Sequence, residues 1–175
     1  MNECIRVFAF PFFGESYQMT VTVTKIDTKW DTKKTQEVTS QMFASMFVSA
    51  FEVISKQGEK ALEEFHTIAR THKIAYYKTL NIVTPMDLVK AIAETEHNVF
   101  GSQIEISGDD KKATLKYVSC GMWEATQKTA KFTPEQEEKM GVSCASNWTL
   151  IAKEFGFEYE PKMEKDSYEM TFIKK

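Results

Sequence analysis

The chain has 175 residues, of which 42% are hydrophobic and 27% charged, a composition typical of globular proteins. A chain of this length fits one domain with a substantial core, so we expect a single domain over residues 1–175. The formal net charge of −3 and the lack of a Lys/Arg cluster with interleaved aromatic residues argue against a nucleic-acid-binding surface.

Cysteine usage and hydropathy indicate the compartment. Three cysteines are an odd number and do not suggest the disulfide framework of a secreted protein. The first residues lack the basic start and long apolar core of a signal peptide. No apolar run approaches the roughly 20 residues that cross a bilayer. These features predict a cytoplasmic protein with no membrane contact.

The first elements expected along the chain are strands. The apolar run at residues 5–13 contains Pro11 and suits an edge strand. Residues 17–24 alternate strictly and are rich in β-branched side chains, as strands are. The polar segment 25–36 is expected to be a loop or a weak continuation of the strand.

Two helices are expected next. The first begins near Ser40, a candidate N-cap, and the second ends near Tyr77, with Gly58 as a break between them. Each shows apolar residues at helical spacing, which predicts one buried face. In the first helix this face comprises Met42, Met46, Phe47, Ala50, Phe51 and Ile54. In the second it comprises Leu62, Phe65, Ile68 and Ala69.

A third helix has the strongest start signal. Thr84, Pro85 and Asp87 supply a capping hydroxyl, a proline at the first helical position and an acid in the first turn. Gly101 is suited to end this helix in the left-handed conformation. The predicted buried stripe comprises Leu88, Ala91, Ile92 and Thr95.

A β-hairpin is expected after this helix. Residues 103–106 and 113–117 alternate on either side of a turn at 107–110. Because each alternating strand needs one buried face, we expect the hairpin to pair with residues 17–24 or with the C-terminal strands in one sheet.

The C-terminal part combines helices and strands. A capping box at Thr133 and Gln136 starts a short helix that ends by Gly141. A separate helix is expected over residues 143–155, and two closing strands near 155–160 and 168–173. Because strands and helices occur in groups rather than in alternation, we predict an α+β domain with an antiparallel sheet and helices packed on one side.

Two similar cysteine patterns carry the clearest chemical signal. Val-Ser-Cys occurs at 118–120 and at 142–144, and each is followed by an apolar helical pattern with a tryptophan three or four residues on. A thiol in the first turn of a helix faces unpaired N–H groups and the positive end of the dipole, which lowers its pKa. We therefore take Cys120 and Cys144 as candidate catalytic residues that border one pocket. The alternative is that each is a small buried side chain.

Aromatic residues near the two cysteines are candidates for binding a substrate. Tyr117, Trp123 and Trp148 lie closest in the sequence to the thiols. The chain also has 13 phenylalanines and nine methionines, which fill cores and also line adaptable pockets. His66 lies next to Phe65 near the expected buried face, and it is the candidate for acid–base catalysis.

Metal binding is a further alternative. Glu63 and His66, and likewise Glu94 and His97, are three residues apart on a helix, as in di-metal helical bundles, with Glu52 as a further ligand. No C-x-x-C pair is present. The sequence therefore leaves the metal and the cofactor open.

The layout of residues 57–174 resembles a known family. The resembling pieces are the Gly-Glu-Lys-Ala-Leu segment at 58–62, the hairpin ending at Cys120, the helix with Cys144, and the terminal strand at 168–172. They are similar to prokaryotic L-2-amino-thiazoline-4-carboxylate hydrolase-like proteins and to related 4-vinyl-reductase-type ligand-binding domains. Met170 stands where this family often carries a further cysteine. The resemblance implies a small-molecule pocket between helices and an antiparallel sheet.

Three functional hypotheses follow. The first is a hydrolase-like enzyme that acts on a small heterocyclic or amide-like substrate, with Cys144 or Cys120 as nucleophile and His66 moving protons. The second is a non-catalytic ligand-binding or sensory domain with the same pocket. The third is the di-metal protein. In each case the expected partner is a small molecule, and the oligomeric state is open, with a homodimer as one alternative.

Overall fold

The computed structural model describes residues 29–164 and 167–175. The strands expected at residues 5–13 and 17–24 lie outside the described residues. The description below concerns the unit Asp31–Lys175. Its helices are α1 (Thr32–Ser55), α2 (Glu59–Lys78), α3 (Pro85–Thr95), the π-helical turn η1 (Glu96–Phe100), α4 (Gly121–Thr129) and α5 (Pro134–Glu154). Its strands are β1 (Gln103–Gly108), β2 (Lys112–Ser119), β3 (Phe157–Glu164) and β4 (Ser167–Lys174).

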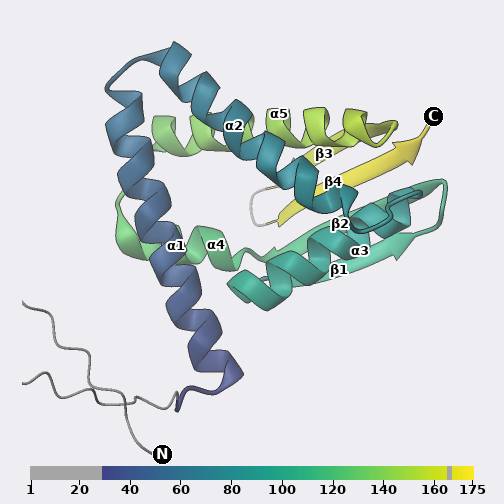
Figure 1. The fold of residues 1–175 in the computed structure, drawn as a ribbon, viewed down its shortest axis with the longest axis horizontal. Coiled ribbons are helices and arrows are strands. Elements are labelled where there is room, and N and C mark those ends of the chain that lie inside the picture. Colours follow the sequence, from purple (N-terminus) through teal and green to yellow (C-terminus); the bar gives the residue numbers. More distant parts are fainter. Residues whose placement is uncertain (1–28, 165–166) are drawn as a thin grey trace, which may run out of the picture. The chain divides into compact units, whose positions relative to one another are not determined.

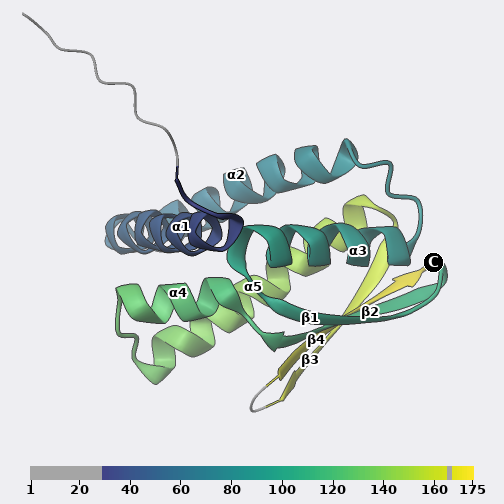
Figure 2. The same ribbon diagram turned by 90° about the horizontal axis from the view of Figure 1, so that it is seen from below.

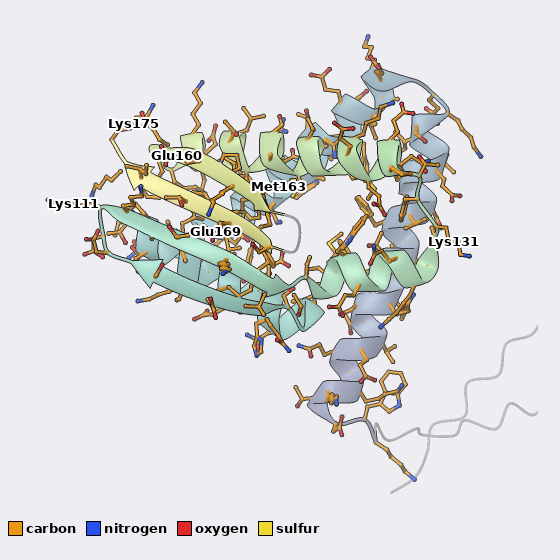
Figure 3. All side chains as sticks on the ribbon, turned by 180° about the vertical axis from the view of Figure 1, so that it is seen from behind. Lys111, Lys131, Glu160, Met163, Glu169 and Lys175 are labelled. Atoms are coloured by element: carbon orange, nitrogen blue, oxygen red, sulfur yellow. The ribbon has the colours of Figure 1, made fainter. Side chains whose placement is uncertain are left out.

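The four strands form one antiparallel sheet in the order β1-β2-β4-β3 (Figure 1). The register places apolar side chains on one face, and helices cover that face (Figure 2). Charged side chains such as Glu160 and Glu169 project from the strands on the uncovered face (Figure 3). The buried side chains of the covered face are Ala113, Leu115, Tyr117, Phe157, Met170 and Phe172. The predicted α+β architecture with helices on one side is therefore confirmed.

The hairpin β1–β2 was predicted correctly, and it pairs with the C-terminal strand β4. Leu115 is fully buried and Ile104 half-buried. The turn requires Gly108, which has φ +116° and whose added Cβ would lie 2.2 Å from the carbonyl oxygen of Lys112.

Helix α1 begins earlier than expected. Asp31 is its N-cap, and the side chain of Asp31 accepts a hydrogen bond of 2.7 Å from the Lys34 N–H. The end of the polar segment 25–36 is therefore helical, and the loop prediction is wrong there. Ser40 is inside the helix, where its hydroxyl donates to the carbonyl oxygen of Val99 at 2.9 Å, so it is not the N-cap.

The buried face of α1 was predicted only in part, since Phe47, Ala50, Phe51 and Ile54 are half-buried. The buried residues are the small ones, Ser40, Ala44 and Val48, whereas Met42 and Met46 are 63% and 72% exposed. Small side chains let a helix approach its neighbours closely, and α1 contacts α2, α4 and η1 along this side. By length and composition alone, α1 is also long and apolar enough to cross a membrane.

Helix α2 follows the expected break, because Gly58 occupies the N-cap position at φ +98°. Its inward face was predicted only in part. Leu62 and Phe65 are half-buried, but Ile68 and Ala69 are exposed and Tyr77 is the buried residue. The inward face of α2 contacts α5, and α5 in turn contacts strand β3 of the sheet (Figure 1).

Helix α3 begins as predicted. Thr84 and Asp87 form a capping box, and Pro85 is at the start of the helix. Leu88, Val89, Ala91 and Ile92 are buried against the sheet. The helix continues into η1, which ends at Gly101 in the left-handed conformation, φ +74°.

Helix α5 is continuous from Pro134 to Glu154, so the prediction of two helices separated near Gly141 is wrong. The predicted capping box at Thr133 and Gln136 is present. A glycine inside a helix costs only about 1 kcal/mol relative to alanine, so the surrounding helical sequence outweighs it.

Candidate functional site

Glu96 is the most buried carboxylate of the site, with 7% of its surface exposed. It begins η1, a type of turn often found at functional sites. The Ser102 hydroxyl donates to its Oε2 at 3.5 Å. Burial raises the pKa of Glu96, while Lys73, Ser102 and Tyr117 act in the opposite direction.

Cys120 lies between β2 and α4, at the N-cap position of α4. A helix N-terminus is expected to lower the pKa of a thiol, and the backbone N–H groups of Trp123 and Met122 do so at Cys120. Burial outweighs it, and together with the charges of Glu96 and Cys144 it raises the pKa of Cys120 to about 11. The thiol is therefore protonated at neutral pH.

Cys144 is in the middle of α5, not in the first turn of a helix as predicted. The residue is exposed to solvent, and yet desolvation by the surrounding protein raises the pKa of its thiol. Lys73 and Trp148 oppose this rise in pKa, and Glu96 adds to it.

The two thiols belong to one group of interacting side chains, which we call the thiol cluster: Lys73, Glu96, Ser102, Tyr117, Cys120, Cys144, Tyr159 and Tyr168. Cys120 and Cys144 each contribute to the raised pKa of Tyr117, and Cys144 also raises the pKa of Cys120. Both cysteines are free thiols. The Tyr159 and Tyr168 hydroxyls are hydrogen-bonded to each other, and burial together with Cys144 raises the pKa of both phenols.

His66 lies elsewhere, in a groove between α2 and α5. Its Nε2 is 3.2 Å from the Ser143 hydroxyl, and burial and the nearby Arg70 lower its pKa. Because Ser143 and Cys144 are consecutive in a helix, they point about 100° apart. The structure therefore groups His66 with Ser143 rather than with the two thiols.

The groove beside His66 is open and has a volume of about 650 Å³. Arg70 donates to Asn147 at 2.7 Å across it. Acidic side chains of both helices line it, together with Lys139.

The three candidate substrate-binding residues lie in different surroundings. Trp148 and Tyr117 are in the hydrophobic core, 5% and 9% exposed. Trp148 stacks on Tyr77, and the Lys73 ammonium is 4.5 Å from the centre of its ring. Trp123 is half-buried and stacks on Phe132, which follows α4.

No group of three or more His, Cys, Asp or Glu side chains in the described part of the chain could hold a metal ion. Glu63 lines the α2–α5 groove with His66. Glu94 and His97 are both exposed at the end of α3, where His97 Nδ1 is 3.1 Å from the Ser102 carbonyl oxygen. Glu52 is exposed on α1.

The sequence analysis did not identify Glu96 as the buried carboxylate of the thiol cluster. The signal was present, since Glu96 follows Leu88 and Ile92 at four-residue spacing and therefore continues the buried stripe of α3. A carboxylate on an apolar stripe is a strong indication of a buried polar site. Lys73 and the pair Tyr159–Tyr168 carried no comparable signal, because strands and helices far apart in the sequence bring them together.

The pKa values predict how the two thiols react with iodoacetamide. Cys144 should be alkylated in the folded protein because it is exposed, and its rate should keep rising above the ordinary thiol pKa of about 8.5. Cys120 should stay unmodified at pH 8, because its pKa is about 11. Peptide mass mapping over a pH series, with Cys4→Ser as background and Cys144→Ala as control, measures both rates. A Cys144 rate that levels off below pH 8 would contradict the raised pKa.

No protein-family model matches the chain, and no curated protein matches it. Function is therefore inferred from the side chains of the thiol cluster and of the α2–α5 groove.

Proposed function

We propose that the protein is a small-molecule-binding domain whose ligand lies beside Cys144, on the helix-covered side of the sheet. One feature carries the proposal: the solvent-exposed Cys144 is electrostatically linked to groups from several separate elements. Lys73 comes from α2, Glu96 from η1 and Cys120 from the start of α4. Tyr159 and Tyr168 come from β3 and β4. Convergence of polar groups on one accessible place is typical of ligand sites.

The chemistry of the cluster indicates the kind of ligand. Raised pKa values keep the thiols and phenols protonated at neutral pH, so they offer S–H and O–H donors. Aromatic rings stand behind them, as in the stacked pair Tyr117–Tyr168. A small, flat molecule with hydrogen-bond acceptors fits this set of groups.

The same properties favour binding over the hydrolase hypothesis. A cysteine nucleophile acts as the thiolate, which a lowered pKa or an adjacent base provides. Here the pKa of both thiols is raised, and the imidazole of His66 contacts Ser143.

Mass spectrometry tests the proposal. The purified full-length protein, sprayed from non-denaturing buffer, should carry an organic molecule above the chain mass of 20.1 kDa and lose it on denaturation. Cys144→Trp should abolish the adduct, because the larger side chain fills the place of the ligand.

The matched control is Val142→Trp. Val142 is 66% exposed on the same helix, but it lines the α2–α5 groove, so this variant should keep the adduct. Equal loss in both variants would contradict the assigned place. An adduct that survives denaturation on Cys144 would favour the hydrolase hypothesis instead.

A further inference from the structure

The outer side of α1 carries a row of exposed residues that nothing in the described chain covers. The row, which we call the α1 seam, comprises Thr35, Thr39, Met42, Met46, Ser49 and Val53. Met42, Met46 and Val53 are 63%, 72% and 57% exposed. The opposite side of the helix is the buried one, with Ser40, Ala44 and Val48.

The spacing of the seam is that of a helix–helix interface. Its residues follow one another at intervals of 4, 3, 4, 3 and 4, which is the alternation of the two apolar positions in a coiled coil. At 1.5 Å per residue the row is about 27 Å long. Its exposed large apolar residues are Met42, Met46 and Val53, and exposed apolar side chains that lie together mark interaction sites.

We propose that the α1 seam pairs with the α1 seam of a second copy of this chain, in an antiparallel homodimer centred on Ala44. The seam is symmetric about this residue. Met42 then packs against the partner's Met46, and the same contact recurs by the twofold axis. Thr39 meets the partner's Ser49, so two small hydroxyl residues are matched. Thr35 meets the partner's Val53, which has the same shape.

Charges beside the seam fit the antiparallel direction. Lys34 and Glu52 are both exposed, and both lie about 80° from Met42 on the same flank of the helix. In the antiparallel pair, Lys34 lies two residues, or about 3 Å along the axis, from the level of the partner's Glu52. A parallel pair would leave Lys34 about 27 Å along the axis from the partner's Glu52. The present contact of Lys34 with Glu37 is 3.8 Å long and exposed, so it opposes the new pairing only weakly.

The other side of α1 argues for a protein partner rather than a bilayer. Gln41 donates to the Thr129 hydroxyl of α4 at 2.7 Å, and Ser40 to the carbonyl oxygen of Val99. Gln36 donates to the carbonyl oxygen of Asn98 at 3.0 Å. Insertion of α1 across a membrane would break these contacts, whereas a second copy uses only the exposed side and leaves them intact.

Sedimentation equilibrium of the full chain over a micromolar concentration series tests the dimer. The mass should approach twice the chain mass of 20.1 kDa, and Met42→Glu with Met46→Glu should return it to the monomer. Val118→Glu is the control, because Val118 is 50% exposed on the sheet, and the dimer should persist. Circular dichroism should show all variants folded, since every substituted side chain is exposed. A monomeric wild-type chain, or a dimer that survives the double Glu variant, would overturn the proposal.

A charge exchange tests the direction of pairing. Lys34→Glu alone and Glu52→Lys alone should each raise the dissociation constant about fivefold, because each creates two like-charge contacts by symmetry. The double variant should restore the wild-type constant, and failure to restore it would exclude the antiparallel arrangement. If the wild-type chain is monomeric and floats with vesicles of phosphatidylcholine and phosphatidylglycerol, the α1 seam binds a bilayer. That result would overturn the proposal of a homodimer.

Discussion

Gly121→Ala should destabilise the protein by about 3 kcal/mol or more, because the added methyl group meets backbone atoms that have no alternative rotamer. The new Cβ would lie 1.9 Å from the carbonyl oxygen of Phe100 and 3.1 Å from the backbone nitrogen of Ser102. Relief requires the start of α4 to move away from the end of η1. That movement would also break the 3.0 Å hydrogen bond from the Gly121 N–H to the Ser102 hydroxyl.

Urea unfolding followed by circular dichroism measures this effect, and Gly141→Ala is the matched control. Gly141 is inside α5, and its added Cβ would lie 3.3 Å from the flexible end of the Met163 side chain (Figure 3). An alanine inside a helix is favoured over glycine by about 0.5–1 kcal/mol, so this variant should be slightly more stable than wild type. A Gly121→Ala variant within 0.5 kcal/mol of wild type would contradict the close approach of the two backbones.

Glu96→Gln should make the protein increasingly more stable than wild type as pH rises from 4.5 to neutrality. The pKa of Glu96 in the folded state is raised above its ordinary value of 4.5. Below that value both states hold the proton, and the contribution of Glu96 to stability is fully present. As pH rises, the unfolded chain releases the proton first, and wild type loses about 1.4 kcal/mol for each unit by which folding raises the pKa. Glutamine cannot ionise, so the variant escapes this loss.

The free energy of unfolding of wild type and variant, measured by urea at a series of pH values, gives the difference directly. Glu94→Gln removes a carboxylate from an exposed side chain at the same end of α3 and is the control. A difference between wild type and Glu96→Gln that shrinks with rising pH would have the wrong sign. It would show that Lys73 and the hydrogen bonds outweigh burial at Glu96.

Interactions between residues close in the chain were predicted well. The capping hydroxyl of Thr84 and the capping box at Thr133 are present, and the hairpin turn occurs beside Gly108. These features depend on hydrogen bonds and backbone preferences within about four residues, so the local sequence contains what decides them. The grouping of strands and helices likewise led to the correct α+β class.

The candidate site could be predicted only in part. Cys120 was placed correctly at the junction of a strand and a helix. Cys144 was placed in the first turn of a separate helix, whereas α5 runs through it. The lowered pKa expected for both thiols was wrong, because that expectation considered the helix N-terminus and not the burial that other elements impose.

By itself the sequence determined where most elements begin and end, and that they form an antiparallel α+β domain. Only the tertiary structure decided which side of α1 is buried, which residues surround the thiols, and that His66 contacts Ser143. The physical reason is the distance along the chain over which each interaction acts. Caps, turns and alternation act between neighbours in the chain, whereas burial and electrostatic environment depend on which distant elements come together. Helix α1 shows the difference, since its large apolar residues suggested one face and the small Ser40, Ala44 and Val48 permitted the close packing of another.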